Sequence, residues 1–324
     1  MKTSHTKKAA ILTSYQHEYV KSSFYFPSEQ HLKKIFADHD IELHYVSPYY
    51  FNQSLWEFSE HVIIWSDEME IIQEPYKPDI LWVRTWQTLY HLDEMLRDAS
   101  FCTVPSMRLK HIESDKYQVY KYLQEFQPKT TLLTTYYFYP WLQEQFAENI
   151  VVKPVSWTWW YGVEFFTKDE LCSNEVFTKY SWAESMHIVQ DYKNFSDWCP
   201  WLVEWNHDVR LVFAWDKAMI NYIRVPKSWS LKSNIASGGR QFSVPQKKIP
   251  QELYDMSKAI QQKLWVNQND LYSLDYAYCL DEKRRYLIEI NSAPWIWFPD
   301  EDLEYRDEFY NNVATHFSSL VKPL

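Results

Sequence analysis

Residues 149–163, NIVVKPVSWTWWYGV, constrain the fold of this chain more than any other stretch. The apolar run predicts a strand ending at Lys153, and a second strand follows the loop at Val163–Phe166. A lysine at a strand end beside a loop can hold phosphate oxygens, because its ammonium and the loop N–H groups both meet negative charge. Such a loop needs glycine where the backbone approaches the phosphate. The sequence has indole side chains there instead, at Trp157, Trp159 and Trp160.

With glycine at those three positions, the segment would fit the pattern K-P-x-x-G-x-G-G-x-G-V throughout, including Gly162. In that form it resembles the phosphate loop of the ATP-grasp superfamily. The further blocks resemble the glutathione synthetase branch and the related ligases that add glutamate to a ribosomal protein. They are HDVRLVF (207–213), NYIRVP (221–226), NIASGG (234–239), SLDYAY (273–278) and LIEINSAP (287–294). The resemblance covers roughly Ser106 to Pro299, in matching order and spacing.

The resemblance implies an α+β fold in which two subdomains hold ATP between them. We expect this ATP-grasp domain at residues 106–324, with a lid subdomain at about 128–200. Residues 1–105 predict a small α/β domain, because apolar strand candidates alternate there with a helix that Ser28 would cap and a second helix near residues 91–99. Helices are also expected at Arg108–Phe126 and Lys168–Phe177.

Tryptophan stands where glycine is expected elsewhere in the chain. The sequence has 3 glycines and 17 tryptophans in 324 residues, together 20, whereas about 7% glycine, roughly 23 residues, is typical. Trp215 occupies a predicted hairpin turn, Trp265 follows a predicted helix, and Trp295 follows SAP. We therefore expect that UGA codons read as glycine in the source organism have been translated as tryptophan. The alternative is a genuinely tryptophan-rich protein, and apolar or aromatic surroundings are compatible with real tryptophan at Trp56, Trp82, Trp86 and Trp141.

The remaining composition excludes several classes of protein. The net charge of −10 and the pI near 5.6 argue against nucleic-acid or anionic-membrane partners. No apolar run is long enough for a transmembrane helix, and the N-terminus lacks a signal-peptide core. The four cysteines, Cys102, Cys172, Cys199 and Cys279, are scattered and predict reduced thiols of a cytoplasmic protein.

The family pattern assigns the nucleotide contacts. It implies that Lys116 and Lys153 bind the phosphates, together with the loop at positions 157, 159, 160 and 162. The backbone of Leu202 and Val203 would bind adenine, and Glu204 and Asp208 would accept from ribose hydroxyls or the adenine amino group. A solvent-exposed helix lysine at 116 and a turn residue at 208 remain alternatives.

Two arginines are candidates for the transferring phosphoryl group. Arg210 and Arg224 lie on adjacent strands of a predicted hairpin, and forked guanidinium donors suit phosphoryl oxygens. Salt bridges on the strand face are the alternative. Asn234 matches the asparagine of the family's N-x-x-x-G-G block. Arg84, at a strand end, could meet a substrate carboxylate or form a surface or interdomain ion pair.

Three oxygen ligands predict a magnesium site. Glu289 and Asn291 are two residues apart and share one face of a strand, and Asp275 lies on the partner strand of a predicted hairpin. Carboxylate and amide oxygens suit Mg²⁺, with ATP and water completing its shell. A satisfied polar network is the alternative. We expect ATP with two Mg²⁺ ions, which Mn²⁺ could replace.

The resemblance implies an ATP-dependent ligase that joins a carboxylate to an amine through an acyl phosphate. Its substrates would be small-molecule or peptide acids and amines. Two alternatives stay open. If the three loop tryptophans are real, the chain could be a non-catalytic relative that binds a nucleotide or partner. It could also be a phosphotransferase that stops at a phosphorylated product.

Overall fold

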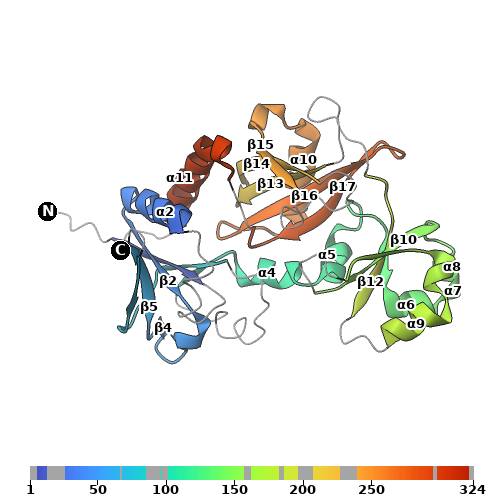
Figure 1. Ribbon diagram of the computed structural model, residues 1–324, viewed down its shortest axis with the longest axis horizontal. Helices are drawn as coiled ribbons and strands as arrows, with labels where there is room; N and C mark the ends of the chain where they lie inside the picture. Colours follow the sequence, from blue (N-terminus) through green and yellow to red (C-terminus); the bar gives the residue numbers. More distant parts are fainter. Residues whose placement is uncertain are drawn as a thin grey trace.

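The chain forms three main sheets that follow one another along the sequence, with the third lying between the first two (Figure 1). The computed structural model describes residues 6–12, 26–65, 68–84, 96, 101–156, 162–181, 186–195, 207–226, 239–294 and 298–320. Mixed sheets with helices on their faces confirm the predicted α+β class.

The N-terminal sheet has the strand order β6-β5-β2-β1-β7-β8. Its parallel core alternates with helix α2 (Phe26–Asp38), as the sequence predicts. The strands are β1 (Lys7–Leu12), β2 (Ile41–Val46), β5 (His61–Trp65), β6 (Glu68–Ile72), β7 (Ile80–Val83) and β8 (Cys102–Val104). A small hairpin, β3 (Phe51–Asn52) and β4 (Glu57–Phe58), interrupts this order.

The C-terminal helix α11 (Leu303–Leu320) returns to pack beside α2 (Figure 1). Phe317 of α11 meets Phe36 of α2 and Trp82 of β7 at ring-centroid distances of 5.6 and 5.4 Å. Residues of the central sheet, such as Tyr222, belong to the same core. The last helix therefore joins the N-terminal unit to the central sheet, and buried Trp82 is a genuine core aromatic.

The lid is a four-stranded antiparallel sheet of order β11-β10-β12-β9. Its strands are β9 (Thr130–Leu132), β10 (Asn149–Pro154), β11 (Glu164–Thr167) and β12 (His187–Asp191). Four short helices cover one face: α6 (Leu133–Phe138), α7 (Pro140–Gln143), α8 (Lys168–Leu171) and α9 (Asn174–Ser181). Alternating side chains such as Ile150 and Val152 point into this small core.

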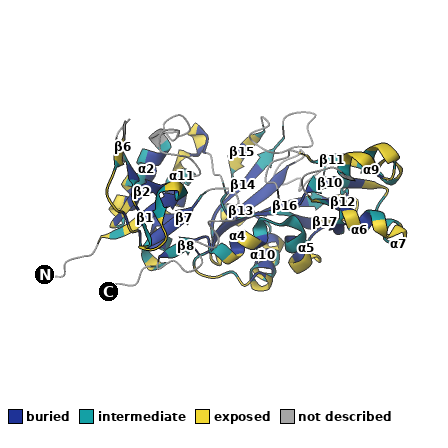
Figure 2. Ribbon diagram, turned by 90° about the horizontal axis from the view of Figure 1, so that it is seen from below, coloured by how far each residue is buried: buried dark blue, intermediate teal, exposed yellow. Residues whose placement is uncertain are grey.

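The central sheet has the order β15-β14-β13-β16-β17 and is antiparallel throughout. Its strands are β13 (Asp208–Ala214), β14 (Lys217–Val225), β15 (Arg240–Ser243), β16 (Leu271–Cys279) and β17 (Arg284–Asn291). Helices α4 (Met107–Glu113), α5 (Lys116–Leu123) and α10 (Gln251–Lys263) share a hydrophobic core with this sheet. Figure 2 shows that β13, β14 and β16 are largely buried.

Three helix predictions need correction. The expected helix Arg108–Phe126 is two helices, because the Asp115 side chain accepts from the N–H groups of Tyr117 and Gln118 and begins α5 anew. The expected helix Lys168–Phe177 is likewise divided into α8 and α9. Ser28 does not cap a helix, since α2 begins at Phe26 and the Ser28 hydroxyl instead meets that of Tyr310.

In the described part of the chain, no helix combines the length and the hydropathy needed to cross a membrane.

Candidate functional site

Four charged side chains form a connected network on one face of the central sheet. Arg210 on β13 is paired in register with Asp275 on β16, and Asp208 with Arg224 on β14. Arg210 donates to both Asp275 oxygens, at 2.6 and 2.5 Å, and Arg224 donates to both Asp208 oxygens at 2.7 Å. Nη2 of Arg224 also reaches Asp275, at 2.6 Å. The predicted hairpin is confirmed, and both arginines form the salt bridges on the strand face that were the alternative to a phosphoryl contact.

Asp275 is buried as an anion. It is 1% exposed, and burial alone would raise its pKa, but the guanidiniums of Arg210 and Arg224 hold the pKa below its usual range. The positive charges of the two arginines compensate the negative charge of buried Asp275. Loss of either arginine would therefore leave negative charge uncompensated.

Glu289 on β17 lies directly opposite Asp275, and Asn291 lies opposite Ser273. Burial raises the pKa of Glu289, with a further rise from the charge of Asp275 and opposing effects from Lys116 and the two arginines. A cation beside this carboxylate pair would relieve that unfavourable charge.

Two carboxylates and one amide offer oxygen donors of the type that suits a hard cation. In this structure both Asp275 oxygens accept from arginines, and the Asn291 amide oxygen accepts from the Ala293 N–H. Within the described ranges, no three His, Cys, Asp or Glu side chains come together as ligands.

Two lysines from different elements lie near Glu289. Lys153 is in β10, near its end, and donates to Gln190 Oε1 on β12 at 2.8 Å. Lys116 is the first residue of α5, and its backbone N–H donates to the carbonyl of Val155, which follows β10. Burial lowers the pKa of Lys153 to about 8, with a further decrease from the Lys116 charge and a partial increase from Glu289.

A pocket between the lid and the central sheet joins these groups. Its polar lining is Glu113, Lys116, Gln127, Lys153, Gln190 and Glu289. The apolar remainder includes Val119, Ile188 and Ile290. The two lysines, predicted from blocks almost forty residues apart in the sequence, therefore lie at the same pocket as a predicted metal ligand.

Gly162 has the backbone that the end of the loop requires. Its φ is +78°, and a Cβ there would lie 3.0 Å from Cγ of Pro154. Glycine is the residue that adopts this conformation without strain. The loop that begins at Lys153-Pro154 thus returns to pass directly over that proline.

Asp208 and Arg84 have contacts that the sequence could not decide. The carboxylate of Asp208, expected near the nucleotide ribose or adenine, accepts the guanidinium of Arg224. Arg84 donates to both Glu29 oxygens at 3.2 Å, which is the ion-pair alternative. The loop positions Trp157, Trp159 and Trp160, the hinge residues Leu202, Val203 and Glu204, and Asn234 lie outside the described residues.

Some residues of the pocket were not predicted from sequence. Gln190 holds the amine of Lys153 and itself donates to Thr130 Oγ1 at 2.8 Å. Glu113 accepts from Ser292 Oγ at 2.8 Å. A glutamine that alternates with apolar residues in MHIVQDY was a usable signal for an inward-facing polar side chain, whereas Glu113 had none.

Solved structures of other proteins share the fold over almost the whole chain. A D-alanine–D-alanine ligase from Bacillus anthracis aligns with a TM-score of 0.62 at 14% identity, covering 98% of both chains. A RimK domain protein from Sphaerobacter thermophilus aligns at 0.62 and 12% identity, covering 95% of this chain and 98% of that one. The chain has the ATP-grasp fold.

Other structures with this ATP-grasp fold include D-cycloserine synthetase, with a TM-score of 0.62, 11% identity, and coverage of 97% of this chain and 100% of that one. No protein-family model and no curated protein sequence matches the chain. At these identities the likeness establishes the fold, and the activity must be argued from the residues of this site.

Proposed function

We propose that this chain is an ATP-dependent carboxylate–amine ligase. The observation that carries the proposal is that Lys116, Lys153 and Glu289 line one pocket between the lid and the central sheet, while Glu289 also lies opposite Asp275 and feels the charges of the two arginines. Lysines suit a polyphosphate, paired carboxylates suit its metal, and guanidiniums suit a phosphoryl group in transfer. The likeness to D-alanine–D-alanine ligase and D-cycloserine synthetase supports the same class.

The reaction has two steps. An oxygen of the substrate carboxylate attacks the γ-phosphorus of ATP, ADP leaves, and an acyl phosphate forms. The substrate amine then attacks the acyl carbon, inorganic phosphate leaves with the electron pair of the broken C–O bond, and the nitrogen loses a proton. Activation is needed because an unactivated carboxylate is a poor electrophile, and ATP supplies it without a protein nucleophile.

Each charged group of the site has a separate role in this scheme. Lys116 and Lys153 bind the phosphates of ATP before and during transfer. Arg210 and Arg224 stabilise the charge that spreads over the moving phosphoryl oxygens. Asp275, Glu289 and Asn291 hold Mg²⁺, which offsets phosphate charge when bound. We propose two such ions, with Mn²⁺ as a substitute.

The remaining contacts rest on the family pattern. We propose that Leu202 and Val203 bind adenine through their backbone, that Glu204 accepts from the nucleotide, and that Asn234 contacts the reacting groups. The acids and amines are small molecules or peptides. Because the reaction consumes ATP, we propose the cytoplasm as its location.

We also propose that positions 157, 159 and 160 are glycine in the working enzyme. The positive φ of Gly162 supports this, since the end of the same loop already needs glycine conformations. Three indoles would fill the space that the phosphates need. A protein made with tryptophan at these positions is therefore expected to bind ATP poorly.

The test compares the written sequence with a protein that has glycine at 157, 159 and 160. Both are assayed for ADP release with ATP, Mg²⁺ and a panel of amino acids and acidic peptides. Release that needs both an acid and an amine supports the ligase. Release with one substrate and a phosphorylated product would instead identify a phosphotransferase. Nucleotide binding without turnover across the panel would identify a non-catalytic relative.

A further inference from the structure

Three tryptophans have the backbone conformation of glycine. Among the described residues that are not glycine, positive φ occurs at five: Trp56 at +54°, Trp215 at +54°, Trp265 at +48°, Asp40 and Lys283. Aspartate enters this left-handed region through its short polar side chain, but a bulky side chain there is an outlier. Glycine adopts it without steric cost.

Trp265 ends helix α10 at the position where glycine is the usual residue. Its N–H donates to the carbonyl of Gln262 at 3.2 Å, and the N–H of Val266 donates to that of Gln261 at 3.0 Å. With Leu264 as the C-cap, these two bonds are the 5→2 and 6→1 bonds of a Schellman motif. The residue in the left-handed conformation of that motif is most often glycine, and the Trp265 side chain is 63% exposed.

Trp215 is the first of two residues that connect β13 to β14. Asp216, the second, has no positive φ, so the signs of φ match a type II′ turn, which has glycine at the first central position. The backbone is fixed there, because Trp215 N–H donates to the Asp270 carbonyl at 2.7 Å and Tyr272 donates to the Trp215 carbonyl at 3.0 Å.

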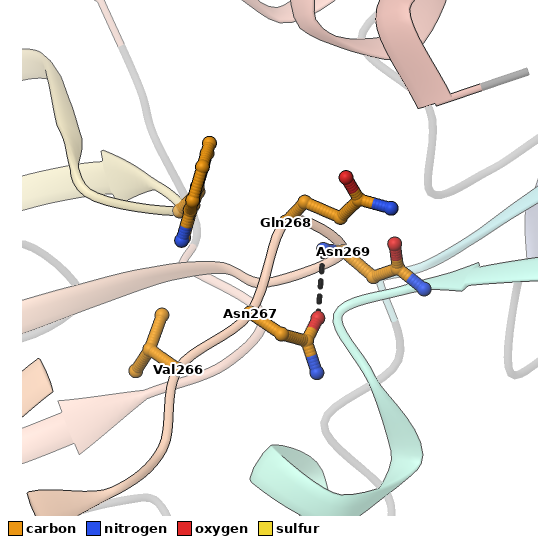
Figure 3. A pocket seen from close by; sticks show the side chains of 5 residues that line it. Val266, Asn267, Gln268 and Asn269 are labelled. Atoms are coloured by element: carbon orange, nitrogen blue, oxygen red, sulfur yellow. Dashed lines mark hydrogen bonds between the residues drawn. The ribbon is translucent and has the colours of Figure 1, made fainter. Parts of the chain in front are cut away.

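The Trp215 side chain also forms one wall of a surface hollow whose other lining residues are Val266, Asn267, Gln268 and Asn269 (Figure 3). In Figure 3 the Asn267 side chain accepts from the backbone of Asn269, so its oxygen stabilises its own turn. Glycine at 215 would remove one wall of this hollow. We therefore assign it no ligand.

Trp56 is the last residue of the four-residue loop between β3 and β4. Asn52 starts the loop with a turn, since its carbonyl accepts from Leu55 N–H and its side chain accepts from Ser54 N–H. Trp56, in the left-handed conformation, then leads the chain back to Glu57, which pairs with Asn52. Its aromatic surroundings, including Phe51 at 6.1 Å, were compatible with a genuine tryptophan, but the backbone favours glycine.

From these three turns we infer that the native protein has glycine at positions 56, 215 and 265, encoded by UGA. This inference needs no assumption about the activity, because a helix end, a tight hairpin and a four-residue loop each require it separately. It extends the glycine assignment to Trp56, whose surroundings were compatible with a genuine tryptophan. It also extends the assignment to the N-terminal part of the chain.

Thermal unfolding of single variants tests the backbone requirement. Trp56→Gly, Trp215→Gly and Trp265→Gly are each expected to raise Tm by about 2–4 °C, because left-handed strain is relieved. The matched control is Trp141→Gly. Trp141 is 59% exposed in helix α7 and has no positive φ, so glycine there is expected to lower Tm. Lower Tm in all four variants would overturn the inference. Peptide masses of the protein from its source organism decide the residue directly, and tryptophan at 56, 215 and 265 would also overturn it.

A different observation concerns Asp208. Its side chain is 12% exposed, and both oxygens of its carboxyl group accept from Nε and Nη2 of Arg224, directly across the strand pair. The same Nη2 reaches Asp275. The third nitrogen, Nη1, has no hydrogen-bond acceptor among the described residues. Asp208 thus fixes the plane of the guanidinium and leaves one donor edge for a ligand.

We propose that Asp208 is a positioning residue for Arg224 and not a contact to the nucleotide sugar or base. This rests on the proposed role of Arg224 in phosphoryl transfer. The bidentate pair fixes the guanidinium without the entropy loss that a mobile arginine would incur on meeting the phosphoryl group.

The experiment uses the enzyme with glycine at 157, 159 and 160. Asp208→Asn is expected to lower kcat at least tenfold and to leave the Kd values for ATP and 2′-deoxyATP unchanged. Its effect on kcat should disappear in an Arg224→Ala background, because the two residues act as one unit. Weaker binding of ATP but not of 2′-deoxyATP would overturn the proposal, and so would additive effects on kcat. If the unmutated enzyme shows no turnover, the proposed function fails, while the two binding measurements still decide whether Asp208 contacts the sugar.

Discussion

Arg210 and Asp275 face each other across β13 and β16, and the guanidinium donates to both carboxylate oxygens, at 2.6 and 2.5 Å. The pair is buried, so the arginine stabilises the fold and also presents a donor to the site. Variants of Arg210 must therefore be measured for both stability and activity.

Arg210→Ala is expected to lower kcat on the order of a hundredfold, about 2.7 kcal/mol, with a smaller effect on the Kd for ATP. It should also lower the free energy of unfolding by about 3–5 kcal/mol, because buried Asp275 would lose both hydrogen bonds from Arg210 and keep only the one from Arg224. Urea unfolding and steady-state kinetics measure the two effects. Arg210→Lys keeps the charge but loses the fork, so it should restore stability more than kcat. A variant with unchanged kcat and only a raised KM for ATP would contradict the assigned role.

In the enzyme with glycine at 157, 159 and 160, Glu289→Gln is expected to abolish Mg²⁺-dependent ATP turnover and to leave the fold intact. The amide removes a charged metal ligand, but it also removes a buried carboxylate whose pKa is raised by burial and by Asp275. Circular dichroism and ADP release check both parts. The exposed Glu301→Gln provides the control. Turnover near the unmutated rate in Glu289→Gln would mean that Glu289 does not bind the metal.

Lys153 predicts a particular pH dependence of nucleotide binding. Its pKa is lowered to about 8, so the free protein loses this positive charge as pH rises through 8. The affinity for ATP should therefore fall above pH 8, and Lys153→Ala should weaken binding at every lower pH. Calorimetric titration with ATP from pH 7 to 9.5 measures this pH dependence of the affinity. Lys153→Arg keeps its charge throughout, so affinity that still falls in that variant would assign the effect to another group.

The N-terminal sheet is expected to be acid-labile because of two stacked histidines. The rings of His44 and His61 lie 4.7 Å apart, and both pack on Tyr76. Burial lowers the pKa of His44 to about 4, against the attraction of Glu42 and with further decreases from His61 and Lys33. The unfolded chain, with a pKa near 6.5, binds more protons between pH 6.5 and 4.

Stability should therefore decrease as pH falls through that window, by on the order of 3 kcal/mol in total, and change little from this group below pH 4. Urea unfolding followed from pH 7 to 4 measures it. His44→Phe should flatten the dependence, whereas replacement of the half-buried His39 by Gln should not. A His44→Phe protein with an unchanged slope would contradict this account.

The parts of the site that follow from strand period and register could be predicted from the sequence. Glu289 and Asn291 share a face because they are two residues apart, and the hairpin places Asp275 opposite Glu289. The two-residue period of a strand does not identify the residue with which a charged side chain forms its ion pair or hydrogen bond. Asp208 meets Arg224 through the register of the β13–β14 hairpin, and Lys153 meets Gln190 because β10 pairs with β12 and not only with the next strand, β11. The break between α4 and α5 was missed because an aspartate cap competed with a continuous apolar pattern.

The tryptophans show the converse case, in which the sequence as written misleads and the backbone corrects it. Turn chemistry predicted glycine at 215 and 265, and both positions have positive φ. Glycine was not predicted at position 56, because the aromatic neighbours of Trp56 suggested a packed side chain. Its backbone conformation is instead set by a four-residue loop. Local backbone requirements were thus more informative than the neighbouring side chains.

The transfer of an oxygen atom tests the ligase most directly. An acid that supports ADP release together with an amine is labelled with heavy oxygen in its carboxylate. The enzyme with glycine at 157, 159 and 160 then converts it, and the inorganic phosphate is analysed by mass. The account predicts phosphate that carries one heavy oxygen from the acid, because that oxygen attacks the γ-phosphorus and leaves with it when the amine arrives. Unlabelled phosphate released with the amide would contradict the acyl-phosphate mechanism.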